Sequence, residues 1–273
     1  MGRISSLFER LLEEGRPGLI AYITAGDPAP DRTADLVAAL ERGGADLIEL
    51  GVPFSDPIAD GPVIQRGADR ALRAGTSVAK VLRIAAEIRS RSDIPILLFT
   101  YLNPILRYGL DALAKDARVR GIDGCLMTDL SVEEADQYVS VMRQHDLDTV
   151  FLGAPTSTPE RLKLVAKYST GFVYLVSRAG VTGERDSLSQ SVAPLVAAMR
   201  NITDLPLAVG FGISTADHVR SVGAVADAVA VGSAFVRTVE QYGASAELEE
   251  HLEAQARELA AGLGKRAMPM RTA

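Results

Sequence analysis

The chain repeats one pattern eight times: a short apolar run followed by a segment with helical periodicity. The runs are residues 19–24, 47–52, 94–101, 124–128, 149–153, 171–177, 206–211 and 226–232. Near-continuous apolar strands that alternate with helices are typical of a parallel sheet covered by helices. Eight such units without a break in composition predict a closed (β/α)8 TIM barrel, and an open doubly wound sheet is the alternative.

The length of the chain sets the expected domain organisation. All 273 residues are predicted to form one domain, because α/β barrels routinely reach this size. We expect an N-terminal helix in residues 1–16, a barrel core in 17–245, and a C-terminal helix and tail in 246–273. The N-terminal helix precedes the first apolar run and is expected to close the end of the barrel opposite the active site.

Charge and hydropathy restrict the partners. The net charge of −6 argues against a general polyanion binder, so any phosphate has to be held by local groups. No apolar run reaches the roughly 18 residues of a membrane span, and the first residues lack the pattern of a signal peptide. We therefore expect a cytoplasmic protein that binds neither nucleic acid nor membrane.

Two carboxylates near the end of the second apolar run are candidates for acid/base catalysis. Glu49 lies within the run, and Asp60 follows in a loop rich in proline. Burying an unpaired carboxylate is costly, and catalytic groups of this fold sit at the carboxyl ends of strands. One interpretation of Glu49 is a proton acceptor with a shifted pKa, and the other is a structural carboxylate bound by backbone N–H groups.

Three tyrosines, Tyr22, Tyr101 and Tyr174, fall near the ends of the first, third and sixth runs. Around one barrel mouth they would line a pocket for a flat ring and offer their hydroxyl groups. Taken singly, each also fits an ordinary core position. The pattern favours an aromatic ligand and leaves the role of each tyrosine open.

Glycine clusters after the last two runs predict a phosphate site. Residues 210–214 read Gly-Phe-Gly-Ile-Ser, Gly232 and Ser233 follow the eighth run, and residues 179–183 form another glycine-rich loop. Barrels often bind phosphate between the seventh and eighth loops, where glycine lets backbone N–H groups approach the oxygens and a helix dipole favours the anion. Tight turns that need positive φ are the alternative.

Several catalytic groups are missing from the positions where other mechanisms need them. None of the five lysines ends a predicted strand, so a Schiff base is not expected. The three histidines fall on predicted helices or beyond them, which leaves no histidine cluster for a catalytic metal, and no dinucleotide fingerprint occurs. What remains is metal-free acid/base chemistry by carboxylates on a small phosphorylated substrate.

Residues 47–62, Leu-Ile-Glu-Leu-Gly-Val-Pro-Phe-Ser-Asp-Pro-Ile-Ala-Asp-Gly-Pro, closely resemble the signature of the tryptophan synthase alpha subunit family. Further motifs match at residues 24–28, 101–104, 177–183 and 210–214. The resemblance implies retro-aldol cleavage of indole-3-glycerol phosphate to indole and D-glyceraldehyde 3-phosphate. It also implies an α2β2 complex with a beta subunit, whose pyridoxal phosphate joins indole to L-serine in L-tryptophan biosynthesis. No cofactor or metal is then expected in this chain.

The resemblance also implies roles for individual residues. Glu49 matches the catalytic acid/base, Asp60 matches the carboxylate that accepts the indole N–H, and Tyr174 matches a catalytic residue near the substrate hydroxyl. The residues expected to bind substrate are Tyr22, Tyr101, Thr182, Gly183, Phe211, Gly212, Gly232 and Ser233. Residues 178–189 are expected to act as a lid, with Thr182 meeting Asp60 when it closes.

Three other functions remain open at this point. A stand-alone indole-3-glycerol phosphate lyase that releases free indole would use the same residues. Another phosphosugar isomerase or epimerase is disfavoured by the match at residues 47–62, and a non-catalytic regulatory partner is disfavoured by intact Glu49 and Asp60. Ser131 stands where many relatives carry proline, in a segment expected to face the beta subunit.

Overall fold

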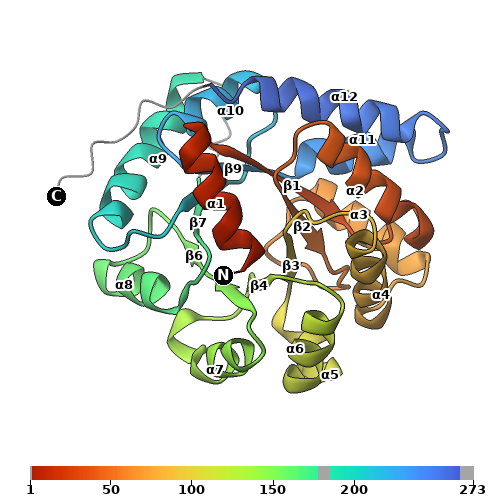
Figure 1. Cartoon of the computed structure of the whole chain (residues 1–273), viewed down its shortest axis with the longest axis horizontal. Coiled ribbons are helices and arrows are strands. Elements are labelled where there is room, and N and C mark those ends of the chain that lie inside the picture. The colour runs from red at the N-terminus through yellow and green to blue at the C-terminus, as the bar shows by residue number, and fades with distance from the viewer. Residues whose placement is uncertain (1, 178–184, 265–273) are drawn as a thin grey trace.

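The computed structural model describes residues 2–177 and 185–264, with the backbone alone for 185–191. Parallel strands form one sheet in the order β5-β4-β3-β2-β1-β9-β8-β7-β6. They are β1 (Gly18–Thr24), β2 (Leu47–Gly51), β3 (Ile96–Thr100), β4 (Gly124–Met127), β5 (Asp148–Val150), β6 (Leu152–Gly153), β7 (Val173–Val176), β8 (Leu207–Gly210) and β9 (Ala228–Val231). Phe151 alone joins the two edge strands, β5 and β6, so the sheet curls into a nearly closed barrel (Figure 1). The predicted barrel is confirmed, with its fifth strand in two pieces.

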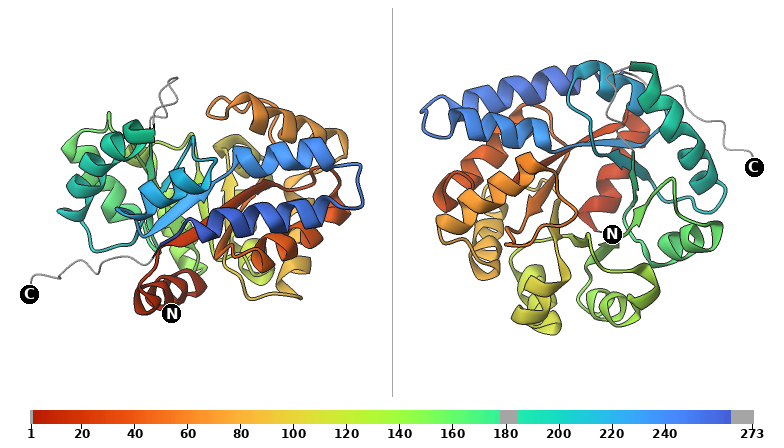
Figure 2. Two further views of the ribbon diagram at one scale, coloured as in Figure 1. Left: turned by 90° about the horizontal axis from the view of Figure 1, so that it is seen from above. Right: turned by 180° about the vertical axis from the view of Figure 1, so that it is seen from behind.

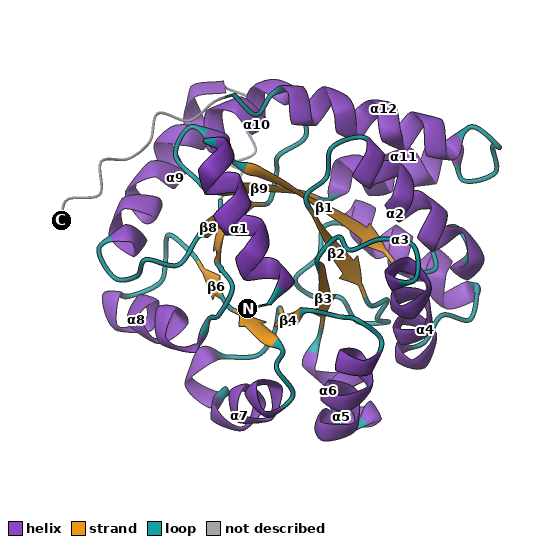
Figure 3. Cartoon of the chain, viewed as in Figure 1, coloured by secondary structure: helices purple, strands orange, loops and turns teal. Residues whose placement is uncertain are grey.

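Helices surround the barrel (Figure 3). They are α1 (Arg3–Glu14), α2 (Thr33–Arg42), α3 (Pro62–Arg73), α4 (Val78–Arg89), α5 (Leu102–Tyr108), α6 (Leu110–Val119), α7 (Asp136–Gln144), α8 (Pro159–Tyr168), α9 (Arg185–Arg200), α10 (Ala216–Gly223), α11 (Ser233–Tyr242) and α12 (Leu248–Ala261). The sequence pattern predicts neither α3 nor α5. Pro62 occupies the first position of α3, where proline costs no hydrogen bond, and this explains why a proline-rich loop turns into a helix there.

The helix α1 covers one end of the barrel, as the view from above shows (Figure 2). Four of its apolar side chains, those of Ile4, Leu7, Phe8 and Leu11, are buried. The ring of Phe8 lies 5.6 Å from that of Phe172, which directly precedes β7, so α1 covers the amino ends of the strands. The expected extra N-terminal helix is therefore present, and the carboxyl ends of the strands stay free of it.

The predicted domain boundaries fall in connecting segments. Residues 16 and 17 lie between α1 and β1, and residues 245 and 246 lie between α11 and α12. The division at these positions stays a prediction. Within the part of the chain that the structure describes, no helix is both long and apolar enough to cross a membrane.

Alternation along each strand decides which side chains face the barrel interior. In β2, Leu47 packs in the interior cluster, whereas Ile48 and Leu50 pack in the cluster beneath the helices. Because successive residues of a strand point to opposite faces, Glu49 shares the interior face with Leu47. The parallel register pairs Glu49 with Tyr22 of β1, which also belongs to the interior cluster.

Candidate active site

A cavity opens at the carboxyl ends of the strands. Its described lining residues are Tyr22, Glu49, Asp60, Gly61, Ile64, Phe99, Tyr174, Phe211, Gly212, Ile213, Ser214, Ala230, Gly232, Ser233 and Arg237. Most of the predicted site residues are among them. Thr182 and Gly183 lie outside the described residues, and so does the contact expected between Thr182 and Asp60.

Glu49 is buried, and one of its carboxyl oxygens is unsatisfied within the described structure. Its side chain is 2% exposed, and Oε1 has no partner among the described residues. Burial among apolar and aromatic groups disfavours the ionised form, which raises the pKa of Glu49 to about 8. A carboxylic acid with this pKa is largely protonated near neutral pH and can both donate and accept a proton.

Asp60 is a half-buried carboxylate with a neutral donor beside it. The hydroxyl of Tyr101 donates to Oδ2 of Asp60 over 2.9 Å, and the backbone N–H of Ala59 donates to the same hydroxyl over 3.1 Å. Burial raises the pKa of Asp60 to about 6, and the hydrogen bond from Tyr101 opposes this rise. Asp60 is therefore mainly ionised at neutral pH, while Glu49 mainly keeps its proton.

The tyrosines occupy different places around these two acids. Tyr22 and Tyr174 line the cavity, and burial raises the pKa of both phenols, with smaller effects of nearby negative charge from Asp60 on Tyr22 and from Glu49 on Tyr174. Tyr101 is not among the lining residues; its hydroxyl reaches Asp60, and its ring lies 5.2 Å from that of Phe54. We therefore infer that Tyr101 acts through Asp60.

Two glycines at strand ends make room for the cavity tyrosines. A Cβ on Gly51 would lie 2.3 Å from the hydroxyl oxygen of Tyr22, and a Cβ on Gly210 would lie 1.9 Å from that of Tyr174. Either substitution would push the tyrosine out of its place. Gly210, part of a cluster predicted to bind phosphate, is thus needed first for the packing of Tyr174.

Of the other predicted phosphate residues, the three within the described chain, Gly212, Gly232 and Ser233, all line the cavity. Gly212 has a φ of 75°, a conformation that glycine adopts at little cost. Gly232 precedes α11, whose first residue is Ser233, and no side chain caps this helix. Unpaired backbone N–H groups at a helix start attract anions, so this side of the cavity suits a phosphate.

Seven of the described lining residues are absent from the predicted site set, and four of these also lie outside the matched stretch 47–62 and the glycine cluster 210–214. Ile64 is in the unpredicted helix α3, and Ala230 is a small residue within β9. Phe99 packs edge-on against Tyr22 at 5.3 Å between ring centroids. Arg237 follows Ser233 by one helical turn. Phe99 shares the interior face with Leu97, two residues earlier, but the run is largely apolar, so no alternation marks that face in the sequence.

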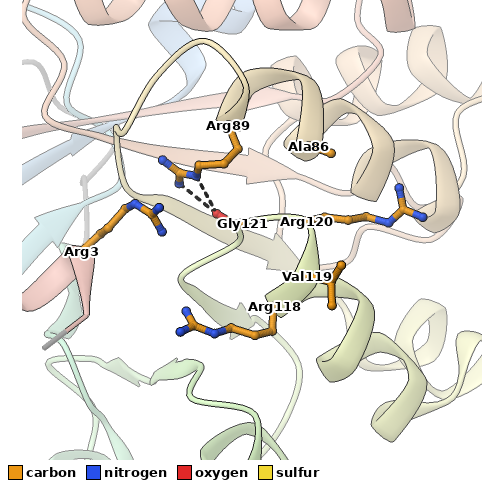
Figure 4. Close-up of a pocket in the computed structure, with 7 residues that line it drawn as sticks. All are labelled: Arg3, Ala86, Arg89, Arg118, Val119, Arg120 and Gly121. Carbon is orange, nitrogen blue, oxygen red and sulfur yellow. Dashed lines mark hydrogen bonds between the residues drawn. The ribbon is translucent and has the colours of Figure 1, made fainter.

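A second cavity lies at the amino end of the barrel (Figure 4). It is lined by Arg3, Ala86, Arg89, Arg118, Val119, Arg120 and Gly121. Arg89 donates to the backbone oxygen of Gly121, and Arg120 points away from the other arginines. No carboxylate lines this cavity within the described chain, so it does not offer the acid/base chemistry of the first. Among the described residues, no group of three or more His, Cys, Asp or Glu side chains is arranged to hold a metal ion.

The chain resembles known proteins over almost its whole length. Residues 8–265 match the family model described as "Tryptophan synthase alpha chain". The tryptophan synthase alpha chain of Solibacter usitatus is 67% identical over 267 residues, which cover 98% of this chain and 100% of the relative. That of Geobacter sulfurreducens is 47% identical, covering 90% of this chain and 93% of the relative.

Solved structures of the same name share the fold. The tryptophan synthase subunit alpha of Legionella pneumophila superposes with a TM-score of 0.89 at 37% identity, covering 96% of this chain and 98% of that one. A chain of tryptophan synthase from M. tuberculosis superposes with a TM-score of 0.86 at 36% identity, with coverages of 96% and 98%. On the family match, these identities and this coverage, the chain belongs to the tryptophan synthase alpha chain family.

Proposed function

We propose that Glu49 and Asp60 carry out the reaction of this alpha subunit, the retro-aldol cleavage of indole-3-glycerol phosphate to indole and D-glyceraldehyde 3-phosphate. The reaction belongs to tryptophan biosynthesis and makes the chain a lyase. The observation that supports the assignment best is the pairing of two carboxyl groups in one cavity, one mainly protonated and one mainly ionised at neutral pH.

Glu49 transfers the protons of this mechanism. The carbon–carbon bond breaks when C3 of the indole is protonated and the adjacent side-chain hydroxyl loses its proton. The protonated Glu49 donates to C3, and the resulting carboxylate then accepts the hydroxyl proton as the aldehyde forms. The residue returns to its starting state, so one group with a pKa of about 8 serves both steps.

Asp60 stabilises the charge that develops in the ring. Protonation of C3 places positive charge on the indole nitrogen, and a carboxylate that accepts the N–H stabilises this state more than the ground state. The pKa of about 6 keeps Asp60 ionised at neutral pH, and the hydrogen bond from Tyr101 fixes one of its oxygens.

Aromatic side chains supply the surface for the indole ring. Tyr22, Phe99, Tyr174 and Phe211 line the cavity, and the ring of Phe211 meets that of Tyr174 edge-on at 6.2 Å. The negative charge of Glu49 contributes to the raised pKa of Tyr174, and this proximity supports a role for the Tyr174 hydroxyl near the reacting end of the substrate. These contacts orient the ring between the two acids.

Phosphate binding falls to Gly212 in the loop after β8, to Gly232 and Ser233 at the start of α11, and to Gly183. The first three line the cavity. Substrate would therefore lie with its ring between the acids and its phosphate at the helix start, which holds the reacting bond in place.

The chain works with a beta subunit and needs no cofactor of its own, because pyridoxal phosphate belongs to the beta subunit. The partner converts the released indole. Four large apolar residues of the described chain are exposed: Ile58 (84%), Val119 (80%), Leu106 (60%) and Leu12 (48%). Two of these, Ile58 in the loop after β2 and Leu106 in α5, follow the carboxyl ends of strands. We assign them to the surface that meets the beta subunit, together with the segment around Ser131, and place the complex in the cytoplasm.

The test is turnover of indole-3-glycerol phosphate by the full-length chain, with and without a beta subunit. Equal amounts of indole and D-glyceraldehyde 3-phosphate are expected, with faster cleavage when the beta subunit is present. Absence of both products under both conditions would refute the proposed function. Fast cleavage by the chain alone that the partner does not change would favour a stand-alone lyase.

A further inference from the structure

The side chains that line the active-site cavity carry little positive charge for a substrate with a phosphate group. The described lining residues of the cavity include two carboxyl groups, Glu49 and Asp60, and one cationic side chain, Arg237. A phosphate monoester carries close to two negative charges at neutral pH. Backbone N–H groups contribute only partial charges, so Arg237 is the one full positive charge that the described wall of the cavity offers to a dianion.

The position of Arg237 suits a group bound at the start of α11. Arg237 follows Ser233 by four residues, and residues at this spacing share one face of a helix. Side chains of a helix lean toward its amino end, which brings the guanidinium back over the first turn. That first turn contains no acidic residue and its start has no side-chain cap. A cation beside a positive helix end is unfavourable unless an anion binds there.

Arg237 is also free to take up a ligand. Among the described residues it has no ion-pair partner, although Glu240 lies three positions further along the same helix. The carboxylate of Glu240 is held by Arg66 (2.6 Å) and Arg70 (3.0 Å) from α3. These arginines, Arg66 first, lower the pKa of Glu240 to about 2. The acid that would otherwise neutralise Arg237 is thus engaged elsewhere.

We propose that Arg237 pairs with the phosphate of the substrate and sets the preference of the enzyme for phosphorylated over unphosphorylated indole glycerols. This proposal rests on the proposed function and adds a specificity-determining residue to it. The guanidinium offsets the repulsion between the phosphate and the carboxylate of Asp60, while the backbone N–H groups fix the position of the oxygens. Arg237 acts on binding and does not touch the bond that breaks.

The test compares Arg237→Gln with the wild-type full-length chain. We expect the KM for indole-3-glycerol phosphate to rise at least tenfold, with kcat changed by less than about threefold. Calorimetry is expected to show the same loss of affinity for glycerol 3-phosphate. Affinity for an indole alcohol without phosphate is expected to stay the same. Arg237→Lys should recover most of the lost affinity, because it restores the charge.

A matched control is Arg73→Gln, which removes one exposed arginine of α3 that has no described ion pair and does not line the cavity. Its KM and its glycerol 3-phosphate affinity are expected to equal those of wild type. Unchanged glycerol 3-phosphate affinity in Arg237→Gln would overturn the proposal, as would an equal loss for phosphorylated and unphosphorylated ligands. The calorimetry needs no turnover, so it tests Arg237 even if the cleavage reaction itself were absent.

Discussion

The two ends of the barrel each bury a carboxyl group and surround it in opposite ways. At the amino end, Asp123 is 5% exposed and accepts hydrogen bonds from Arg3 (3.1 Å), Arg89 (2.9 Å) and the backbone N–H of Ile96 (2.8 Å). At the carboxyl end, Glu49 is 2% exposed and its Oε1 has no partner in the described structure. Within the described chain, the same barrel therefore contains an acid with several charged and backbone donors and an acid with an unsatisfied oxygen.

This difference separates stability from reactivity. A buried acid with charged partners holds its neighbours in place, and removing its charge leaves those partners unsatisfied. A buried acid without partners is unstable as an ion and so keeps a proton that it can pass to a ligand. The amino end of a TIM barrel generally serves stability and the carboxyl end catalysis. Amide substitutions of the two acids, which keep shape and remove ionisation, test whether this division holds here.

The largest expected effect is the loss of activity in Glu49→Gln. The amide cannot exchange the proton that both reaction steps require, so kcat should fall by roughly 10²–10⁴-fold. Calorimetric affinity for glycerol 3-phosphate should stay close to wild type, because Glu49 is not assigned to phosphate binding. A variant that retains more than about a tenth of wild-type kcat would contradict the acid/base role.

The second effect is the loss of stability in Asp123→Asn. This substitution removes the carboxylate with which both Arg3 and Arg89 form ion pairs. Removal of one partner from a buried ion pair typically costs about 3–5 kcal/mol of stability. Urea denaturation measures the change in free energy of unfolding. The value of kcat per folded molecule should match wild type, and a large loss of kcat without loss of stability would contradict the comparison.

The third effect is a stabilisation by Glu49→Gln that grows with pH. The folded-state pKa of Glu49 is raised from 4.5 to about 8, so between these values the folded chain holds a proton that the unfolded chain releases. Wild-type stability should therefore fall as pH rises from about 4.5 to 8, by up to roughly 3–5 kcal/mol, while the amide adds no such dependence. Urea denaturation of both proteins at pH 5 and pH 8 measures the difference. Equal pH dependence in the two would mean that Glu49 is ionised in the folded state.

Position along the strand shows why the sequence was informative about Glu49. Asp46 directly precedes β2 and Asp123 directly precedes β4. Both acids therefore lie at the amino end of the barrel, where Asp46 pairs with Arg16 and Asp123 pairs with Arg89. Glu49 is the third residue of β2 and faces the interior, where the neighbouring strands supply apolar and aromatic side chains. The apolar runs mark the strands in the sequence, so the barrel and the position of an acid within its second strand could be predicted.

Contacts made by loops and helix surfaces were not predictable in the same way. The hydrogen bond between Tyr101 and Asp60 joins the end of β3 to the loop after β2, and no periodicity specifies how that loop folds. In the sequence, Arg237 resembles any surface charge, because only the structure shows that Glu240 forms ion pairs with Arg66 and Arg70. The helix α3 was also missed, because its proline-rich start resembles a loop. These features depend on tertiary contacts between distant segments.

The smallest expected effect concerns Asp60, which has one described side-chain donor and so lies between the two extremes. Tyr101 donates to the carboxylate and stabilises its ionised form, so Tyr101→Phe should raise the pKa of Asp60 further above its ordinary value. A hydrogen bond worth about 1 kcal/mol corresponds to a shift of under one pH unit. The acidic limb of the pH profile of kcat/KM, expected near pH 6 in wild type, should move upward by that amount.

The control for this shift is Tyr138→Phe, which removes another buried tyrosine hydroxyl, one that donates to the backbone oxygen of Cys125 away from the cavity. Its acidic limb should coincide with that of wild type. A downward shift in Tyr101→Phe, or none, would mean that the limb reports a different group. An upward shift confined to Tyr101→Phe would show that the donor beside Asp60 makes this carboxyl group easier to ionise, in contrast to Glu49, whose Oε1 has no described donor.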